Sequence, residues 1–141
     1  MKIIGTGSSL PQKVVTNDDL AAIMDTSDEW ISSRTGIRKR HIATTETTTS
    51  LAVEAVKAAL SDAGTDGSEI DLIIAASVTG DKIVPSLACQ IQAEIGADSA
   101  VAFDINAACS GFLFALATAD AYFKTGRFHK AVILGAEVLS K

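Results

Sequence analysis

The sequence predicts an α/β protein in which helices cover a sheet that is buried on both faces. Three runs of nearly continuous apolar residues, at positions 70–77, 100–105 and 131–138, have the composition of buried strands. Between them lie segments with apolar residues at helical spacing, bounded by capping residues and glycines. Strands that alternate with helices are typical of βαβ units, in which helices are layered on a sheet.

The N-terminal third is predicted to hold a short strand at residues 2–6 and then two short helices, at residues 20–24 and 30–34. Each helix follows a threonine and an acidic residue at capping-box spacing, and a glycine ends the second helix. These capping and terminating residues are Thr16 with Asp19, Thr26 with Glu29, and Gly36.

Three longer helices are predicted farther along the chain. Apolar stripes define the first two, ended by Gly64 and Gly96, and the second begins after Pro85. The third begins near Cys109 and runs to about Lys124, and its first turns are apolar all round, so we expect it to be buried on every side. The chain ends directly after its last strand, and we expect the natural protein to continue. The stripe residues are Leu51, Ala55, Val56, Ala59, Leu60 and Ala63, then Leu87, Ile91 and Ile95.

The bulk composition excludes several classes of protein. The chain has 141 residues, of which 48% are hydrophobic and 21% charged, as in a folded domain rather than a disordered chain. Its net charge of -5 disfavours binding to nucleic acid or to an anionic membrane. No segment predicts a membrane span or a secretory signal. Two cysteines without zinc spacing indicate a reduced, cytoplasmic protein with no metal site.

Cys109 lies where a predicted strand passes into a predicted helix, in the segment DINAACSGF. The free N–H groups and the positive dipole end of a helix stabilise a thiolate, and they can also stabilise an oxyanion on an attached thioester. Ligands of open α/β sheets bind beyond the carboxyl ends of strands, where this turn lies. The alternative is a buried cysteine that acts as a small hydrophobe, which is how we interpret Cys89 within its amphipathic helix.

Trp30 and Arg34 are four residues apart, so they share one face of a short helix. An indole beside a guanidinium can bind a planar base. The only basic cluster of this acidic chain follows at residues 38–41 and could meet phosphates. The alternative is a tryptophan packed on an arginine stem, followed by a solvated run of charge.

Taken together, these segments resemble a known family. Residues 26–43, TSDEWISSRTGIRKRHIA, resemble the N-terminal signature of β-ketoacyl-ACP synthase III, the initiating condensing enzyme of bacterial fatty-acid synthesis. Residues 104–112 resemble its active-site cysteine motif. The segments GTGSSLPQKVVTN and PSLACQIQAEIG also fit, in the right order, so the resemblance covers essentially the whole chain.

The resemblance implies a thiolase-like fold, which has two similar α/β halves, each with a five-stranded mixed sheet, and which is usually homodimeric. Residues 1–141 would form the N-terminal half-domain only, with the C-terminal half absent. The helix that starts near the active-site cysteine would be the buried central helix of that half.

The resemblance also implies a reaction. Cys109 would be the nucleophile that takes an acyl group from acyl-CoA, and its backbone N–H would form part of the oxyanion hole. Trp30 and Arg34 would sandwich the CoA adenine, with Thr26 nearby. Malonyl-acyl carrier protein would be the second substrate, and no tightly bound cofactor is implied.

A histidine and an asparagine of the second half complete the family's chemistry, and neither His41 nor His129 matches that histidine. We therefore expect the chain alone to be unable to complete the condensation. In acetyl-preferring relatives a phenylalanine precedes the proline that matches Pro85 and closes the acyl pocket across the dimer. Val84 replaces it here, which suggests a roomier pocket.

Other functions stay open at the level of sequence. One keeps the fold but changes the chemistry, as in hydroxymethylglutaryl-CoA synthases or plant-type polyketide synthases, and the tryptophan-arginine signature argues against it. Another is a non-catalytic chain that binds CoA or assembles with a separate second half.

Overall fold

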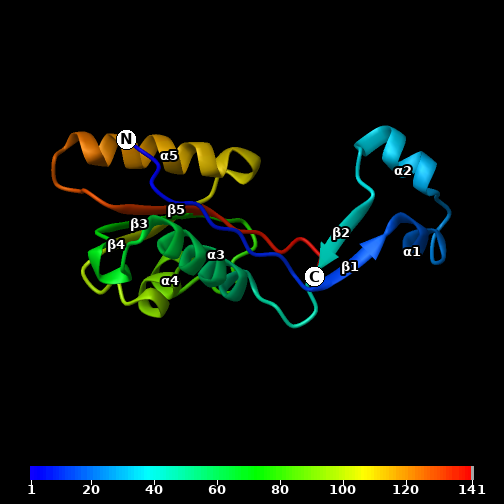
Figure 1. The fold of residues 1–141 in the computed structure, drawn as a ribbon, viewed down its shortest axis with the longest axis horizontal. Coiled ribbons are helices and arrows are strands. Elements are labelled where there is room, and N and C mark those ends of the chain that lie inside the picture. The colour runs from blue at the N-terminus through cyan, green and yellow to red at the C-terminus, as the bar shows by residue number, and fades with distance from the viewer. Residues whose placement is uncertain (141) are drawn as a thin grey trace. The chain divides into compact units, whose positions relative to one another are not determined.

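The computed structural model describes residues 1–140, which divide into two compact units. The sheet unit contains Met1–Ser9 and Thr47–Leu139. The small unit contains Leu10–Glu46 together with Ser140. Figure 1 shows the helices and strands of each unit along the chain.

The sheet unit is built on three parallel strands in the order β4-β3-β5. They are β3 (Leu72–Ala76), β4 (Val101–Ile105) and β5 (Ala131–Gly135), and in the register Leu72 pairs with both Val101 and Ala131. Every residue of the central strand β3 is buried. The three predicted buried strands are therefore confirmed, each somewhat shorter than its apolar run.

Helices cover both faces of this sheet, as predicted (Figure 1). On one face lie α3 (Thr48–Ala63) and α4 (Leu87–Ile95), which enclose the larger apolar core with Ile73 and Ala75. On the other face lies α5 (Gly111–Lys124), packed on Leu72 and Ile74. Two short 3₁₀ turns, Gly67–Glu69 and Ala108–Ser110, precede β3 and α5.

The predicted helix ends are confirmed at three glycines. Gly36, Gly64 and Gly96 have φ angles of 72°, 59° and 68°, a left-handed conformation that residues with a Cβ adopt only at a cost. The capping box of Thr16 and Asp19 is also confirmed, because each side chain accepts a hydrogen bond from the other residue's backbone N–H.

The prediction that α5 is buried on every side is wrong. Only Gly111, Ala115 and Ala119 are buried, because the sheet covers one face of this helix. Phe112, Leu113 and Phe114 are 45%, 67% and 56% exposed. An apolar outer face of this kind marks an interaction surface.

The predicted strand at residues 2–6 is also wrong. This segment pairs with no strand of the described chain and instead lies along α3, where the backbone N–H of Thr6 donates to Asp62 at 2.8 Å. Its glycines permit the contact, since a Cβ on Gly7 would lie 2.2 Å from the carbonyl oxygen of Ala55. In residues 1–140 the main sheet accordingly has three parallel strands, not the five of the expected mixed sheet.

The small unit contains two antiparallel strands, β1 (Lys13–Thr16) and β2 (Lys39–Ile42), and two helices, α1 (Asn17–Ala21) and α2 (Asp28–Thr35). We did not predict either strand, because each has four residues, none of them buried, and neither contains a long apolar run. The two helices were predicted, although each begins two or three residues earlier than expected.

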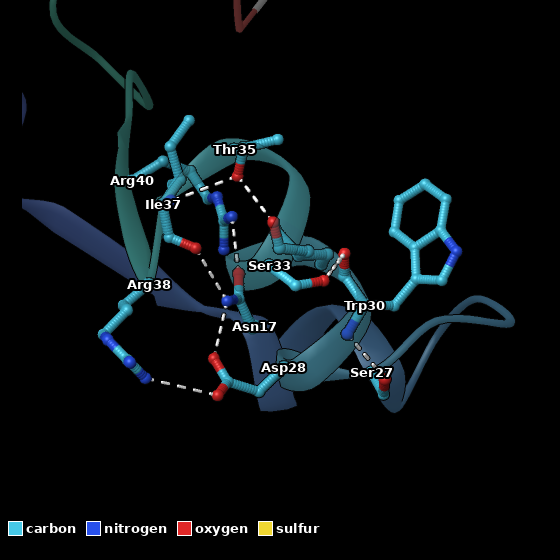
Figure 2. A network of polar contacts seen from close by, with 10 residues as sticks. Asn17, Ser27, Asp28, Trp30, Ser33, Thr35, Ile37, Arg38 and Arg40 are labelled. Atoms are coloured by element: carbon cyan, nitrogen blue, oxygen red, sulfur yellow. Dashed lines mark hydrogen bonds and ion pairs between the residues drawn. The ribbon is translucent and has the colours of Figure 1, made fainter.

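A polar side chain lies at the centre of the small unit (Figure 2). Asn17 is 1% exposed, and its amide donates to Asp28 at 2.7 Å and to the carbonyl of Ile37 at 2.8 Å. Its side-chain oxygen accepts a hydrogen bond from Arg40 at 2.7 Å. These contacts tie α1, α2 and β2 together through one buried amide.

Candidate active site

Cys109 lies beyond the carboxyl end of β4, in the 3₁₀ turn Ala108–Ser110 that leads into α5. Its side chain is exposed to solvent. Since β3, β4 and β5 are parallel, their carboxyl ends meet at one edge of the sheet, and the turn of Cys109 is at this edge. In residues 1–140 the sulfur is therefore not part of the core, which disfavours the alternative of a buried cysteine that acts as a small hydrophobe.

The N-terminus of α5 is directly beside Cys109. Its N-cap residue, Ser110, makes no side-chain capping hydrogen bond. The positive end of the α5 dipole therefore lies at the turn of Cys109 without a side-chain cap. This is the helix position from which the sequence predicted thiolate stabilisation.

The turn before Cys109 has an unusual backbone. Ala108 has a φ of 44°, and it is the only non-glycine residue with a positive φ in the described chain. This conformation costs about 1–2 kcal/mol for a residue with a Cβ. The turn adopts this conformation, and the side chain of Cys109 that follows is exposed to solvent.

Gly111, the first residue of α5, allows a close approach between helix and sheet. A Cβ at this position would lie 2.9 Å from the Cβ of Ala76 at the end of β3. Any larger residue would push the start of α5, and with it the turn of Cys109, away from the sheet.

Cys89 provides a contrast within the same chain. It lies in the first turn of α4, is only partly exposed, and its sulfur is 3.8 Å from the carbonyl oxygen of Ala102. It is half-buried against β4, which fits a small packing side chain, although it lies in the first turn of α4 and not in the middle turns.

Val84 is 83% exposed and its neighbour Ile83 is 95% exposed, on the segment that joins β3 to α4. Within the described chain Val84 therefore lines no pocket of its own. The end of this segment is fixed by Asp104, whose carboxylate accepts hydrogen bonds from the backbone N–H groups of Leu87 and Ala88, both at 2.8 Å.

Asp104 is a residue that sequence reasoning missed. Asp104 is the first residue of the cysteine motif, and the motif alone suggested no separate role for it. It is, however, the only charged residue within the apolar run of β4. A lone carboxylate in a strand that packs under a helix is the signal that could have identified it.

Trp30 and Arg34 form the predicted pair on α2, in the small unit. The guanidinium carbon of Arg34 lies 4.5 Å from the centroid of the indole, which is the geometry of a cation–π contact. Arg34 also donates to the carbonyl of Trp30 at 3.3 Å. Trp30 is 54% exposed and extends away from the polar network (Figure 2). Its indole therefore has an accessible surface for a planar ligand.

The N-cap of α2 is Ser27, not the predicted Thr26, because the Ser27 hydroxyl accepts the hydrogen bond from the backbone N–H of Trp30 at 3.1 Å. Thr26 is instead oriented so that its hydroxyl oxygen is buried without a hydrogen-bond partner in residues 1–140. A buried, unpaired hydroxyl costs free energy, and a ligand that bonds to it would recover that cost.

The basic cluster mostly serves the structure of the small unit. Arg40 bonds to Asn17 and to the carbonyl of Val15, and the ring of His41 lies 2.6 Å from the carbonyl of Pro11. Arg38 forms an exposed ion pair with Asp28 at 3.4 Å. Because Arg40 and His41 are engaged in this way, the sequence argument for a four-residue phosphate site is weakened.

Neither metal-ligand groups nor membrane-spanning helices were found in residues 1–140. No group of three or more His, Cys, Asp or Glu side chains in this range could hold a metal ion. Likewise, none of the helices in the described part of the chain is long and apolar enough to cross a membrane.

Comparison with known proteins confirms the resemblance that the motifs indicated. A family model of 3-oxoacyl-[acyl-carrier-protein (ACP)] synthase III matches residues 103–141. The β-ketoacyl-[acyl-carrier-protein] synthase III of Streptococcus pneumoniae is 55% identical over 140 residues. That alignment includes 99% of this chain but 43% of the relative, so the chain spans less than half the length of the relatives it matches.

Solved structures give the same result and confirm the thiolase-like α/β fold. The 3-oxoacyl-[acyl-carrier-protein] synthase III of Aquifex aeolicus is 52% identical with a TM-score of 0.95, over 99% of this chain and 45% of its own. The enzyme of Pseudomonas aeruginosa is 43% identical with a TM-score of 0.90, over 97% of this chain and 43% of its own. A priming β-ketosynthase of a polyketide biosynthetic pathway is 37% identical with a TM-score of 0.94, and the match covers 99% of this chain and 42% of the ketosynthase.

Proposed function

We propose that this chain is the N-terminal half of an initiating condensing enzyme of fatty-acid synthesis. In this proposal Cys109 accepts an acyl group from acyl-CoA, and the whole enzyme condenses that group with malonyl-acyl carrier protein. The observation that carries it is the exposed sulfur of Cys109 at the uncapped N-terminus of α5, beyond the carboxyl end of β4. The 55% identity to a β-ketoacyl-ACP synthase III supports the assignment of substrates.

The proposed acyl transfer would use this geometry as follows. The Cys109 thiolate attacks the thioester carbonyl, a new carbon–sulfur bond forms, and the CoA sulfur leaves as a thiolate that takes up a proton. One thioester replaces another, so the step is close to isoenergetic and does not trap the acyl group. Negative charge develops on the carbonyl oxygen, and the N–H of Cys109 and the dipole of α5 are available to stabilise it.

Trp30, Arg34 and Thr26 would bind the adenine end of CoA. The exposed indole offers a stacking surface, and the guanidinium already lies over its ring at 4.5 Å. The unpaired hydroxyl of Thr26 would gain a hydrogen bond from the ligand. These three residues lie in the small unit and Cys109 in the sheet unit.

Condensation requires groups that this chain lacks. In the proposal a histidine and an asparagine of the remaining half stabilise the carbanion that forms when malonyl-acyl carrier protein loses carbon dioxide. The active form would be a cytoplasmic homodimer, and the exposed Val84 would enter the acyl pocket of a partner subunit. Its small side chain would admit branched or longer primers.

Mass spectrometry after incubation with acetyl-CoA tests the acyl transfer. The chain would be tested alone and with the part of the Streptococcus pneumoniae relative that it does not cover. We expect one acetyl group on Cys109, lost in Cys109→Ser and retained in Cys89→Ser. Acetylation of Cys89, or of neither cysteine under both conditions, would refute the mechanism. Binding of CoA without any acyl transfer would instead favour the non-catalytic alternative.

A further inference from the structure

Two carboxylates anchor the segment that carries Val84, one at each end. At its start, the carboxylate of Asp81 accepts hydrogen bonds from the backbone N–H groups of Thr48, at 3.2 Å, and Thr49, at 2.7 Å, at the beginning of α3. At its end, the carboxylate of Asp104 accepts the N–H groups of Leu87 and Ala88. Between these anchors, residues 82–85 are all exposed.

Asp104 is the anchor that connects this segment to the strand leading to Cys109. Side chains alternate along β4: Phe103 and Ile105 pack with the core under α5, while Ala102 packs with the core under α4. Asp104 therefore lies on the same face as Ala102, beneath the start of α4. Its position directly precedes Ile105, the last residue of β4 before the turn of Cys109.

The geometry of the contact requires a carboxylate. The N-cap of α4, Ser86, binds the N–H of Cys89 with its hydroxyl, which leaves the first two N–H groups of the helix for Asp104. One oxygen accepts each N–H at 2.8 Å, and the negative charge lies at the positive end of the helix dipole. An asparagine has the same size but only one acceptor oxygen, and its NH₂ group would face an N–H donor.

We propose that Asp104 is a positioning residue that fixes the Val84 segment to the sheet and thereby determines which acyl groups the pocket accepts. The inference rests on the proposed function, in which Val84 borders the acyl pocket. Asp104 touches neither substrate nor Cys109 in this role. Asp104 holds the segment against the sheet of its own subunit. Its effect on the position of Val84 is therefore the same when Val84 enters the pocket of a partner subunit.

The test compares Asp104→Asn with Asp98→Asn in the whole chain. Asp98 is a matched control, because it lies between α4 and β4, is exposed, and its carboxylate makes no hydrogen bond or ion pair in residues 1–140. Amide hydrogen exchange, followed by mass spectrometry, should become about tenfold faster over residues 82–89 in Asp104→Asn and stay unchanged in the control.

The second measurement separates positioning from simple destabilisation. Rates of Cys109 acylation are compared for acetyl-CoA and a branched acyl-CoA, with the complementary part of the relative present as above. A general loss of folding would lower both rates by the same factor, whereas a displaced Val84 segment should change their ratio by about threefold or more. The control should keep the ratio of the unsubstituted chain.

Two results would overturn the proposal: exchange over residues 82–89 that matches the control, or an unchanged ratio of rates despite faster exchange. If the unsubstituted chain accepts no acyl group from either thioester, the proposed function itself fails, and with it the link to acyl selection. The exchange comparison would then still decide whether Asp104 anchors the segment.

Discussion

The sheet unit and the small unit are stabilised by different interactions. The sheet unit buries large apolar side chains completely, among them Leu72, Ile73 and Ile91 at 0% exposure. In the small unit the most deeply buried side chain is the amide of Asn17, at 1%, and the only buried apolar residue of the described chain there is Ala43.

This difference determines how each unit should respond to substitution. Apolar burial contributes in proportion to the area removed from water, so a truncated side chain loses part of the contribution and leaves a cavity. A buried amide contributes through specific partners, and its removal leaves each of those partners without a hydrogen bond. Four substitutions test the contrast, from the largest expected effect to the smallest.

Ile73→Ala should cause the largest loss of stability. Its side chain is completely buried in the centre of β3, so we expect the free energy of unfolding to fall by about 3 kcal/mol. Urea denaturation followed by far-ultraviolet circular dichroism would measure it. Ile83→Ala is the matched control, because Ile83 is 95% exposed and its truncation should change stability by less than about 0.5 kcal/mol. Similar losses in both variants would contradict the assignment of the core.

Asn17→Ala should cost about 2 kcal/mol, because Asp28, Arg40 and the carbonyl of Ile37 each lose a hydrogen-bond partner. Trp30 is the single tryptophan of the chain and lies in the small unit, so its fluorescence reports the unfolding of this unit in urea. The control is Asp18→Ala, which changes an exposed residue of the same helix. If both variants behave alike, the buried amide does not hold the small unit together.

Arg34→Ala should have a small effect, about 0.5 kcal/mol, because its contact with Trp30 is exposed to solvent. Arg34→Lys retains the charge but loses the planar guanidinium, so it should retain only part of the contribution. The same fluorescence measurement in urea compares the three proteins. A loss above 1.5 kcal/mol would mean that the pair is a structural centre of the small unit, and the proposed ligand role would lose its basis.

Glu46→Gln should show the smallest effect, and its signature is a dependence on pH. Hydrogen bonds from the backbone N–H groups of Thr44 and Gln12 lower the pKa of the partly exposed Glu46 from its ordinary 4.5 to about 2. A lowered pKa means that the stabilisation is present above about pH 4.5 and is lost as the pH falls towards 2.

Stability of the small unit would be followed by Trp30 fluorescence between those two pH values. Glu46→Gln should flatten the decline seen in the unsubstituted chain, whereas Glu29→Gln, which changes an exposed residue of α2, should not. An equal decline in all three proteins would show that these hydrogen bonds do not stabilise the small unit.

The same contrast explains how much of the fold could be predicted from the sequence. Strands β3, β4 and β5 are apolar runs because both of their faces are covered, so composition alone identified them. The glycines that end α2, α3 and α4 were identified because a left-handed residue strongly favours glycine. Such features depend on local chemistry, which a single sequence records.

The features that were missed depend on contacts between distant residues. Strands β1 and β2 are far apart in the sequence and have no long apolar run. Asn17 binds Asp28 of α2, Arg40 of β2 and the carbonyl of Ile37, which lies between those two elements. The N-cap of α2 was assigned one residue too early because Thr26 and Ser27 are equally suitable by type. The proposed chemistry of Cys109 was inferred from its motif, but its exposure could only come from the arrangement of β4 and α5.

The close contact between Gly111 and Ala76 restricts how access to Cys109 can change. A Cβ on Gly111 would lie only 2.9 Å from the Cβ of Ala76, so the start of α5 lies directly against the end of β3. Close-packed groups transmit a displacement rather than absorb it, so we expect the start of α5 and the end of β3 to move together. Any opening or closing motion around the sulfur must therefore come from torsions in residues 106–110, where Ala108 already holds a backbone conformation of higher energy. We therefore expect the turn, and not the helix, to act as the hinge of this site.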